Sequence, residues 1–86
     1  MGTMSVDFSS EVALVTGAAG GMGRAIAVAF ARAGANVVMG DIDIEGGQET
    51  ERLVSDIGVG AVFVPTDVSD AEQVRALVAT AVDRFG

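Results

Sequence analysis

The sequence contains no cysteine, histidine, tyrosine, tryptophan or lysine, and all five of its basic residues are arginines. Without cysteine there is no disulfide framework, no cysteine-based zinc site and no thiol nucleophile. Without histidine, the usual base at neutral pH and the commonest metal ligand are missing. A general acid or base would have to be a carboxylate with a strongly raised pKa. The sequence therefore predicts no catalytic residue and no metal site.

Basic residues are outnumbered by acidic ones, which gives a formal net charge of −7 at pH 7. Nucleic-acid binding depends on clustered lysine and arginine, so this charge argues against nucleic acids and equally against anionic membrane surfaces. No apolar run approaches the ~20 residues of a membrane span, and the first residues lack the basic and apolar regions of a signal peptide. We therefore expect a cytoplasmic protein that binds neither membranes nor nucleic acid.

Three short apolar runs, at 12–16, 36–41 and 61–64, alternate with longer amphipathic stretches. The runs are continuously apolar, as is typical of parallel strands that are covered on both faces. The order β-α-β-α-β-α predicts a mononucleotide-binding half of a Rossmann-type, doubly wound α/β fold. Right-handed crossovers place the first two helices on one face of the sheet and the third on the other. The first strand would then form an open edge, which proteins generally avoid.

Details of two of the predicted helices follow from spacing. Met22, Ile26 and Phe30 recur at helical spacing and predict the buried face of the first helix, which Gly34 would end. Residues 69–72 have the form of a capping box, with the Ser69 hydroxyl as the cap of the third helix. The core-facing stripe of that helix is predicted to comprise Val74, Leu77, Val78, Ala81, Val82 and Phe85.

A glycine-rich turn joins the first strand to the first helix. A dinucleotide pyrophosphate needs backbone N–H donors, the positive end of a helix and no Cβ atoms in the way. Gly17 can turn sharply after the strand, the two glycines at its centre let the backbone approach the phosphates, and Gly23 lets helix and strand pack closely. The candidate pyrophosphate-binding residues are Gly17, Ala19, Gly20, Gly21, Met22 and Gly23.

The glycine spacing is more specific than a generic turn. The familiar G-x-G-x-x-G does not occur here, whereas Thr-Gly-x-x-x-Gly-x-Gly begins at Thr16. This motif resembles that of the short-chain dehydrogenase/reductase family, and the resemblance extends over residues 11–86. It implies an oxidoreductase that transfers hydride between NAD(H) and a carbonyl or secondary alcohol, usually as a homo-oligomer. We interpret residues 1–10 as a leader and 11–86 as an NAD-binding half-domain that ends before the catalytic half.

An acid follows the second strand. Asp41 lies 18 residues after Gly23, near the ~20 expected for the carboxylate that binds the adenosine ribose. At an effective dielectric of ~20, two unit charges ~4 Å apart repel by about 4 kcal/mol, so this acid also disfavours a 2′-phosphate. Family members that prefer NADP usually carry a basic residue before the second motif glycine or after the second strand. Gly20 and Ile42 occupy those places, so NAD is favoured over NADP.

A second acid follows the third strand. Asp67-Val68 resembles the Asp-Val pair of the family. The resemblance implies that the Asp67 carboxylate accepts from the adenine amino group and that Val68 packs on the adenine ring. The family's Asn-Asn-Ala-Gly motif and its catalytic Asn, Ser, Tyr and Lys have no counterparts here. No catalytic residue is therefore assigned, and these 86 residues alone are not expected to turn over substrate.

Other functions also fit parts of this pattern. The Thr-Gly-x-x-Gly-x-x-Gly motif of extended-type sugar-nucleotide epimerases and dehydratases fits through Gly17, Gly20 and Gly23. A non-enzymatic dinucleotide-binding module of this length would need the same turn. A methyltransferase that uses adenosylmethionine is disfavoured, because an acid usually ends the first strand in such sites and this sequence has Leu14-Val15-Thr16 there.

Overall fold

The computed structural model describes residues 8–86. Residues 1–7 of the predicted leader lie outside the described residues. Phe8, the first described residue, donates its N–H to the Ala33 carbonyl over 2.7 Å. Its ring packs on Phe30, with the ring centroids 5.4 Å apart. The elements in chain order are β1 (Val12–Thr16), α1 (Gly21–Arg32), β2 (Asn36–Asp41), α2 (Ile44–Ile57), β3 (Ala61–Pro65) and α3 (Ala71–Phe85).

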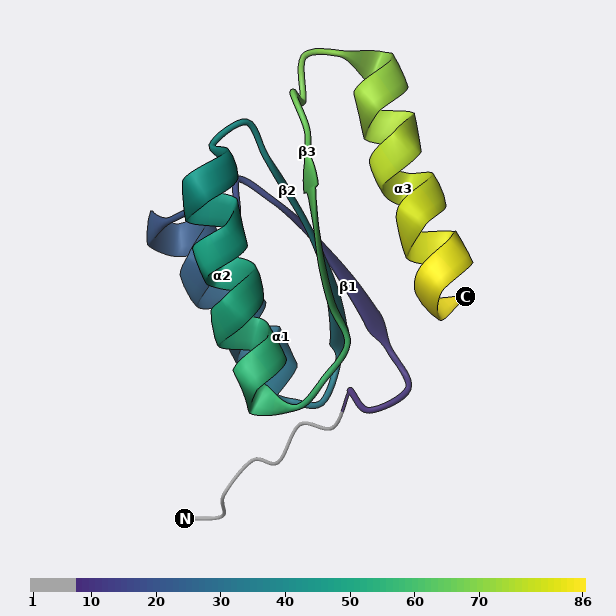
Figure 1. Cartoon of the computed structure of the whole chain (residues 1–86). Coiled ribbons are helices and arrows are strands. Elements are labelled where there is room, and N and C mark those ends of the chain that lie inside the picture. The colour runs from purple at the N-terminus through teal and green to yellow at the C-terminus, as the bar shows by residue number, and fades with distance from the viewer. Residues whose placement is uncertain (1–7) are drawn as a thin grey trace.

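The three strands form a parallel sheet in the order β1-β2-β3, so β2 is central and β1 is an edge strand, as predicted. Helices α1 and α2 cover one face of the sheet and α3 lies on the other (Figure 1). The register pairs Thr16 with Gly40 and Gly40 with Val64. The carboxyl ends of all three strands therefore meet at one edge of the sheet.

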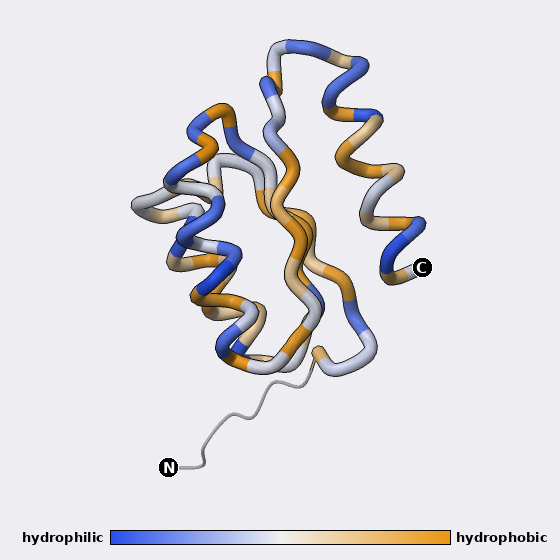
Figure 2. The backbone as a smooth tube through the Cα atoms, in the orientation of Figure 1, coloured by the Kyte–Doolittle hydropathy of each residue, from blue (hydrophilic) through white to orange (hydrophobic). Residues whose placement is uncertain are grey.

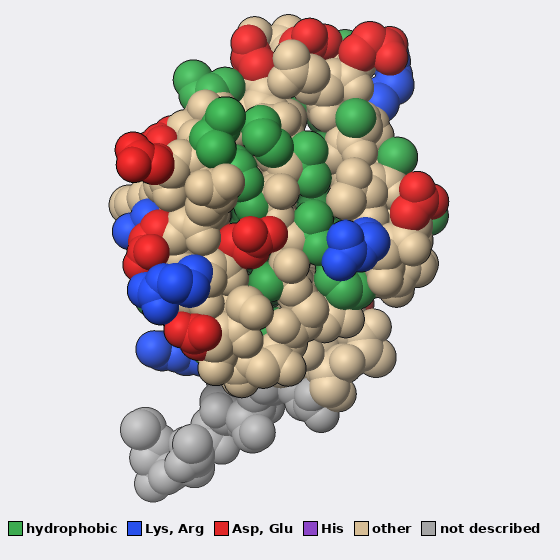
Figure 3. Space-filling model, in the orientation of Figure 1, with side chains coloured by type: hydrophobic (Ala, Val, Ile, Leu, Met, Phe, Trp, Pro, Cys, Tyr) green, Lys and Arg blue, Asp and Glu red, His purple; other side chains and the backbone are tan. Residues whose placement is uncertain are grey.

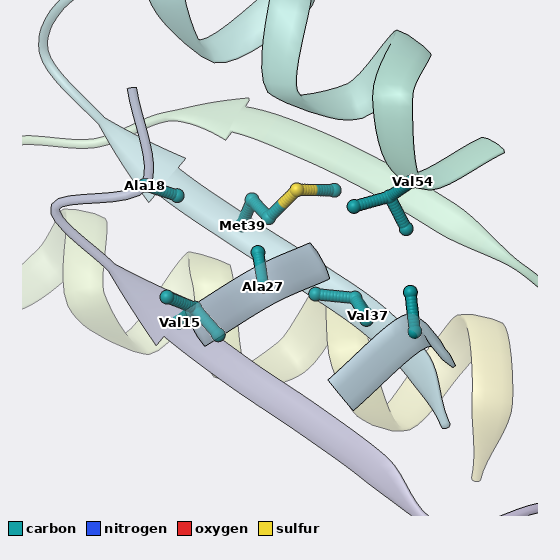
Figure 4. Packing of buried hydrophobic residues seen from close by; sticks show 7 residues of the cluster. Val15, Ala18, Ala27, Val37, Met39 and Val54 are labelled. Atoms are coloured by element: carbon teal, nitrogen blue, oxygen red, sulfur yellow. The ribbon is translucent and has the colours of Figure 1, made fainter. Parts of the chain in front are cut away.

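The core lies between the sheet and helices α1 and α2. Met39 on β2 and Val54 on α2 point toward one another and are fully buried (Figure 4). Burying one such side chain contributes roughly 1.5–3 kcal/mol. Along the chain the strands are apolar while the helices alternate between apolar and polar residues, since one side of each helix faces water (Figure 2).

The predicted buried face of α1 is wrong for Met22 and Ile26, whereas Phe30 is half-buried and packs against the core. Ala27 and Ala31 are buried, whereas Met22 is 78% exposed and Ile26 is 41% exposed. Helix α1 begins so close to the β1–α1 turn that even a Cβ at Gly23 would overlap it. Small side chains therefore fill the interface with the sheet near the start of α1, and Met22 and Ile26 turn away from it.

For α3, the predicted cap is wrong and the predicted stripe is right only in part. The cap is the Asp70 carboxylate, which accepts from the Glu72 and Gln73 N–H groups, whereas the Ser69 hydroxyl donates to Asp67. Of the predicted stripe, Leu77 is buried, but Val78 and Val82 are 44% and 60% exposed. The stripe lies over β2 and the edge strand β1, and no further strand of residues 8–86 covers the rest of it.

Candidate functional site

The turn between β1 and α1 has a backbone that favours glycine at two positions. Gly17 has φ +67° and Gly21 has φ +54°, both in the left-handed region that L side chains rarely adopt. Gly23 is needed for a different reason, because a Cβ there would lie 1.8 Å from the Gly17 carbonyl oxygen. The close packing predicted for Gly23 is confirmed. These three glycines shape a turn that brings the start of α1 against the end of β1.

The N-terminus of α1 has no side-chain cap. Helices α2 and α3 are capped by the carboxylates of Asp43 and Asp70, and each has a glutamate in its first turn. Of the three helices in residues 8–86, α1 alone begins at a glycine, Gly20, with no capping side chain and no acid in its first turn. A Cβ at Gly20 or Gly21 would meet no atom within 4 Å. The positive end of the α1 dipole thus has no capping side chain and no acid in its own first turn.

Asp41, the last residue of β2, lies against this turn. Its Oδ2 accepts from the Ala19 N–H over 2.9 Å and its Oδ1 accepts from the Asp43 N–H over 3.0 Å. These backbone donors, Asp43 first and then Ala19, hold the pKa of the Asp41 carboxyl below its ordinary value, although partial burial opposes them. A negative charge is therefore held beside the uncapped helix end.

A hollow of about 140 Å³ opens where the three strands end. Five of its lining residues belong to the predicted site: Gly17, Asp41, Ile42, Asp67 and Val68. Ile42 and Val68 are 72% and 61% exposed, so both offer apolar surface to the hollow. Hydrophobic side chains gather at this end of the molecule, over the tops of β2 and β3 (Figure 3).

The sixth lining residue, Thr66, was not predicted. Its side chain is 2% exposed, and its hydroxyl donates to the Val64 carbonyl over 2.9 Å. A Cβ at Gly40 would lie 3.1 Å from the Thr66 Oγ1, so the threonine also packs against β2. Its place directly after the third apolar run, and next to a predicted site acid, was the signal that could have found it.

The remaining predicted residues lie beside the hollow. Ala19 and Gly20 continue the turn, and Gly21, Met22 and Gly23 lie in the first turn of α1.

Asp67 lies at the mouth of the hollow and is exposed. Its Oδ1 accepts both from the Ser69 hydroxyl over 2.7 Å and from the Ser69 N–H over 2.9 Å. These bonds, the hydroxyl first, hold the pKa of the Asp67 carboxyl below its ordinary value. Asp41 and Asp67 are thus two ionised acids that line the same hollow.

Within residues 8–86 no group of histidine, cysteine, aspartate or glutamate side chains is arranged to hold a metal ion. None of the helices there combines the length and the apolar character needed to cross a membrane.

Comparison with known proteins identifies the family. The family model described as short chain dehydrogenase matches residues 11–86. The chain belongs to the short-chain dehydrogenase family. Its Rossmann-like β-α-β-α-β-α arrangement agrees with that of its structural neighbours.

Relatives of the chain within this family are named as oxidoreductases. The chain is 47% identical over 79 residues to an uncharacterized oxidoreductase of Mycobacterium tuberculosis, covering 92% of the chain and 32% of that protein. It is 45% identical over 83 residues to the cis-4-hydroxycyclohexanecarboxylate dehydrogenase of Sinomonas cyclohexanicum, covering 96% of the chain and 33% of that protein. The chain therefore spans about a third of the length of these curated relatives.

A solved relative carries a bound dinucleotide. The crystal structure of a short-chain dehydrogenase/reductase from Burkholderia phymatum in complex with NAD matches with a TM-score of 0.89 and 38% identity. The match covers 93% of this chain and 28% of that one. The backbone of this chain is thus similar to part of a protein that binds NAD.

Proposed function

We propose that residues 11–86 form the cofactor-binding segment of an NAD-dependent oxidoreductase, which transfers hydride between NAD(H) and a carbonyl or secondary alcohol. One observation carries the proposal: the uncapped N-terminus of α1 opens into free space next to the ionised Asp41. The family match and the NAD complex of a relative support it independently. Cytoplasmic location and homo-oligomeric assembly are part of the same proposal, and the family resemblance supports the assembly.

The pyrophosphate would bind at the start of α1. An anion there gains from the N–H groups of the first helical turn and from the helix dipole, which contributes roughly 0.3–1 kcal/mol per favourable charge and up to ~2 in partly buried sites. Gly20 and Gly21 add no side chain that would hold the phosphates away, because the space beside their Cα atoms is open. The backbone that would surround the pyrophosphate is that of Gly17, Ala19, Gly20, Gly21, Met22 and Gly23, and within it the Ala19 N–H stays bonded to Asp41.

The adenosine would lie in the hollow at the strand ends. Each carboxylate oxygen has two lone-pair sites, so Asp41 can accept from ribose hydroxyls while it keeps its bonds to Ala19 and Asp43. The exposed Ile42 and Val68 offer apolar surface to an adenine ring. Because both Ser69 donors bond to the Asp67 Oδ1, the Oδ2 is the oxygen that we assign to the adenine amino group.

The charge of Asp41 favours NAD over NADP. A 2′-phosphate near this carboxylate would be repelled by about 4 kcal/mol at ~4 Å and an effective dielectric of ~20. Glycine and isoleucine occupy positions 20 and 42, where a basic residue could offset that repulsion. Arg24, in the first turn of α1, donates to Ala19, Gly46 and Thr50 instead.

When bound, the nicotinamide would accept or give up the hydride. The residues of this chain would bind the dinucleotide and orient it, and no residue among them is assigned to proton transfer. The alcohol or carbonyl substrate would contact other parts of the enzyme.

The test compares cofactor affinities of Asp41→Ala, alone and with Ile42→Arg, in the complete natural polypeptide. Fluorescence titration with NADH and NADPH should give weaker NADH binding and a preference that moves toward NADPH, by about tenfold (1.4 kcal/mol) at least and by about a thousandfold if the whole repulsion of about 4 kcal/mol is relieved. Asp56→Ala is the control, because it removes the same charge from an exposed position where Asp56 pairs with Arg52. Absence of saturable NADH binding below millimolar concentrations would overturn the proposal. An unchanged preference would remove the role of Asp41.

A further inference from the structure

Arg24 bonds to two separate segments of the fold. From the first turn of α1 its Nη2 donates to the Ala19 carbonyl over 2.6 Å and to the Gly46 carbonyl over 3.1 Å. Its Nε donates to the Thr50 hydroxyl oxygen over 2.9 Å. None of the ion pairs between the described residues involves Arg24. Its half-buried guanidinium thus donates to uncharged oxygens of the glycine turn and of α2.

Thr50 completes this connection from α2. Its side chain is fully buried, and its hydroxyl donates to the Ala18 carbonyl over 2.6 Å. The two segments also touch, since a Cβ at Gly46 would lie 2.7 Å from the Ala19 carbonyl oxygen. Two consecutive carbonyls of the turn, those of Ala18 and Ala19, are therefore bonded to the Arg24–Thr50 pair.

Bonding a carbonyl also directs the N–H of the same peptide. In a planar trans peptide the C=O and the next residue's N–H point in opposite directions, and the structure contains no cis peptide among its described residues. The Ala18 carbonyl points to Thr50 and the N–H of the same peptide, that of Ala19, points to Asp41. By the same geometry, the Arg24 bond to the Ala19 carbonyl directs the Gly20 N–H away from α2.

We propose that Arg24 and Thr50 are positioning residues for the dinucleotide site. They hold two peptides of the turn so that the Ala19 N–H stays on Asp41 and the Gly20 N–H faces the side where the pyrophosphate would bind. Donors fixed before binding need not be ordered by the ligand, and this increases affinity. The inference rests on the proposed function for its ligand, whereas the fixed orientation of the turn is a property of the free protein.

Four variants distinguish the positioning role of Arg24 and Thr50 from the effect of the positive charge of Arg24. Arg24→Met removes every guanidinium bond, and Arg24→Lys keeps the positive charge but cannot reproduce the planar fork of donors. Thr50→Val keeps the shape of the threonine but loses its hydroxyl, and Thr50→Ser keeps the hydroxyl. Arg52→Met is the matched control, because Arg52 is an exposed arginine on α2 that pairs with Glu49 and Asp56.

Two measurements are made on each variant of the complete natural polypeptide. Fluorescence titration gives the NADH dissociation constant. Without NADH, the nitrogen-15 NMR signal of the Ala19 amide is followed from pH 7 down to about pH 2, because the pKa of Asp41 lies below its ordinary value. We expect Arg24→Met, Arg24→Lys and Thr50→Val to bind NADH about tenfold more weakly. In these variants the Ala19 signal should shift and lose its dependence on the Asp41 titration, whereas Thr50→Ser and Arg52→Met should behave as the wild type.

Other results would contradict either the positioning role or the proposed function. Full rescue by Arg24→Lys would mean that charge alone matters and would overturn the positioning role. An unchanged Ala19 signal and unchanged affinity in Arg24→Met and Thr50→Val would also overturn it. If the wild type does not bind NADH, the proposed function fails, and the Ala19 signal by itself then decides whether the pair orients the turn. Should Arg24→Met fail to fold, the contrast between Thr50→Val and Thr50→Ser decides the same question.

Discussion

Placing an aspartate at Gly20 should stabilise the protein and abolish its dinucleotide binding in one step. Gly20 is the N-cap of α1, with φ −176° and ψ −177°, an extended backbone that any residue adopts. A Cβ there would meet no atom within 4 Å. The introduced carboxylate would therefore cap α1 as Asp43 and Asp70 cap the other two helices of residues 8–86. We expect the free energy of unfolding to rise by about 1 kcal/mol. The cap contributes a few tenths of a kcal/mol, and the negative charge at the helix N-terminus contributes ~0.3–1 kcal/mol.

The same charge would oppose the pyrophosphate. At ~4 Å and an effective dielectric of ~20, repulsion of about 4 kcal/mol corresponds to roughly a thousandfold weaker binding. Calorimetry should show a Tm raised by about 2–8 °C, depending on the size of the cooperative unit. Fluorescence titration should show NADH binding lost. Gly20→Asn is the control, because it offers a similar cap without the charge and should lose less affinity. Unchanged NADH affinity in Gly20→Asp would refute binding of the pyrophosphate at α1.

Three further predictions concern stability. Gly23→Ala should lower the free energy of unfolding by about 1–3 kcal/mol or more, because the new Cβ would lie 1.8 Å from the Gly17 carbonyl oxygen; an unchanged urea midpoint would contradict this packing. The pKa of Asp41 is below its ordinary value of 3.8, so its carboxylate stabilises the fold above that pH and the stabilisation is lost as pH falls through the lowered pKa. Urea midpoints of Asp41→Asn should thus fall less steeply on acidification than those of the wild type; equal slopes would exclude this contribution. Asp70→Ala should cost about 1 kcal/mol and Ser69→Ala much less, since Asp70 caps α3; thermal unfolding showing the reverse order would restore the serine as the cap.

Much of the fold could be predicted because its signals are local. Continuous apolar runs predicted the three strands, and the right-handed crossover predicted which helices share a face. The spacing of the glycines and of Asp41 predicted a site at the carboxyl ends of the strands, and five predicted residues line one hollow there. These features depend on order and spacing along the chain, which the sequence contains directly.

The helix faces and caps could not be predicted in the same way. Met22 and Ala27 are both apolar and both fit a helical stripe, and the close approach of α1 to β1 decides that the alanine is buried. Serine and aspartate are both good N-cap residues. Because Ser69 donates its hydroxyl and its N–H to Asp67, Asp70 is the residue that caps α3. In each case two local solutions are nearly equal, and contacts outside the helix choose between them.

By itself, the sequence determined the order of the elements, the position of the glycine turn and the acids near the ends of the last two strands. Only the tertiary structure decided that Arg24 bonds to Thr50, 26 positions away, and that Thr50 bonds to Ala18, 32 positions away. Such bonds join residues that have no fixed relation along the chain, and they exist because folding packs α2 against the turn. The sequence thus indicated where a dinucleotide would bind, whereas packing determined how the turn is held in place.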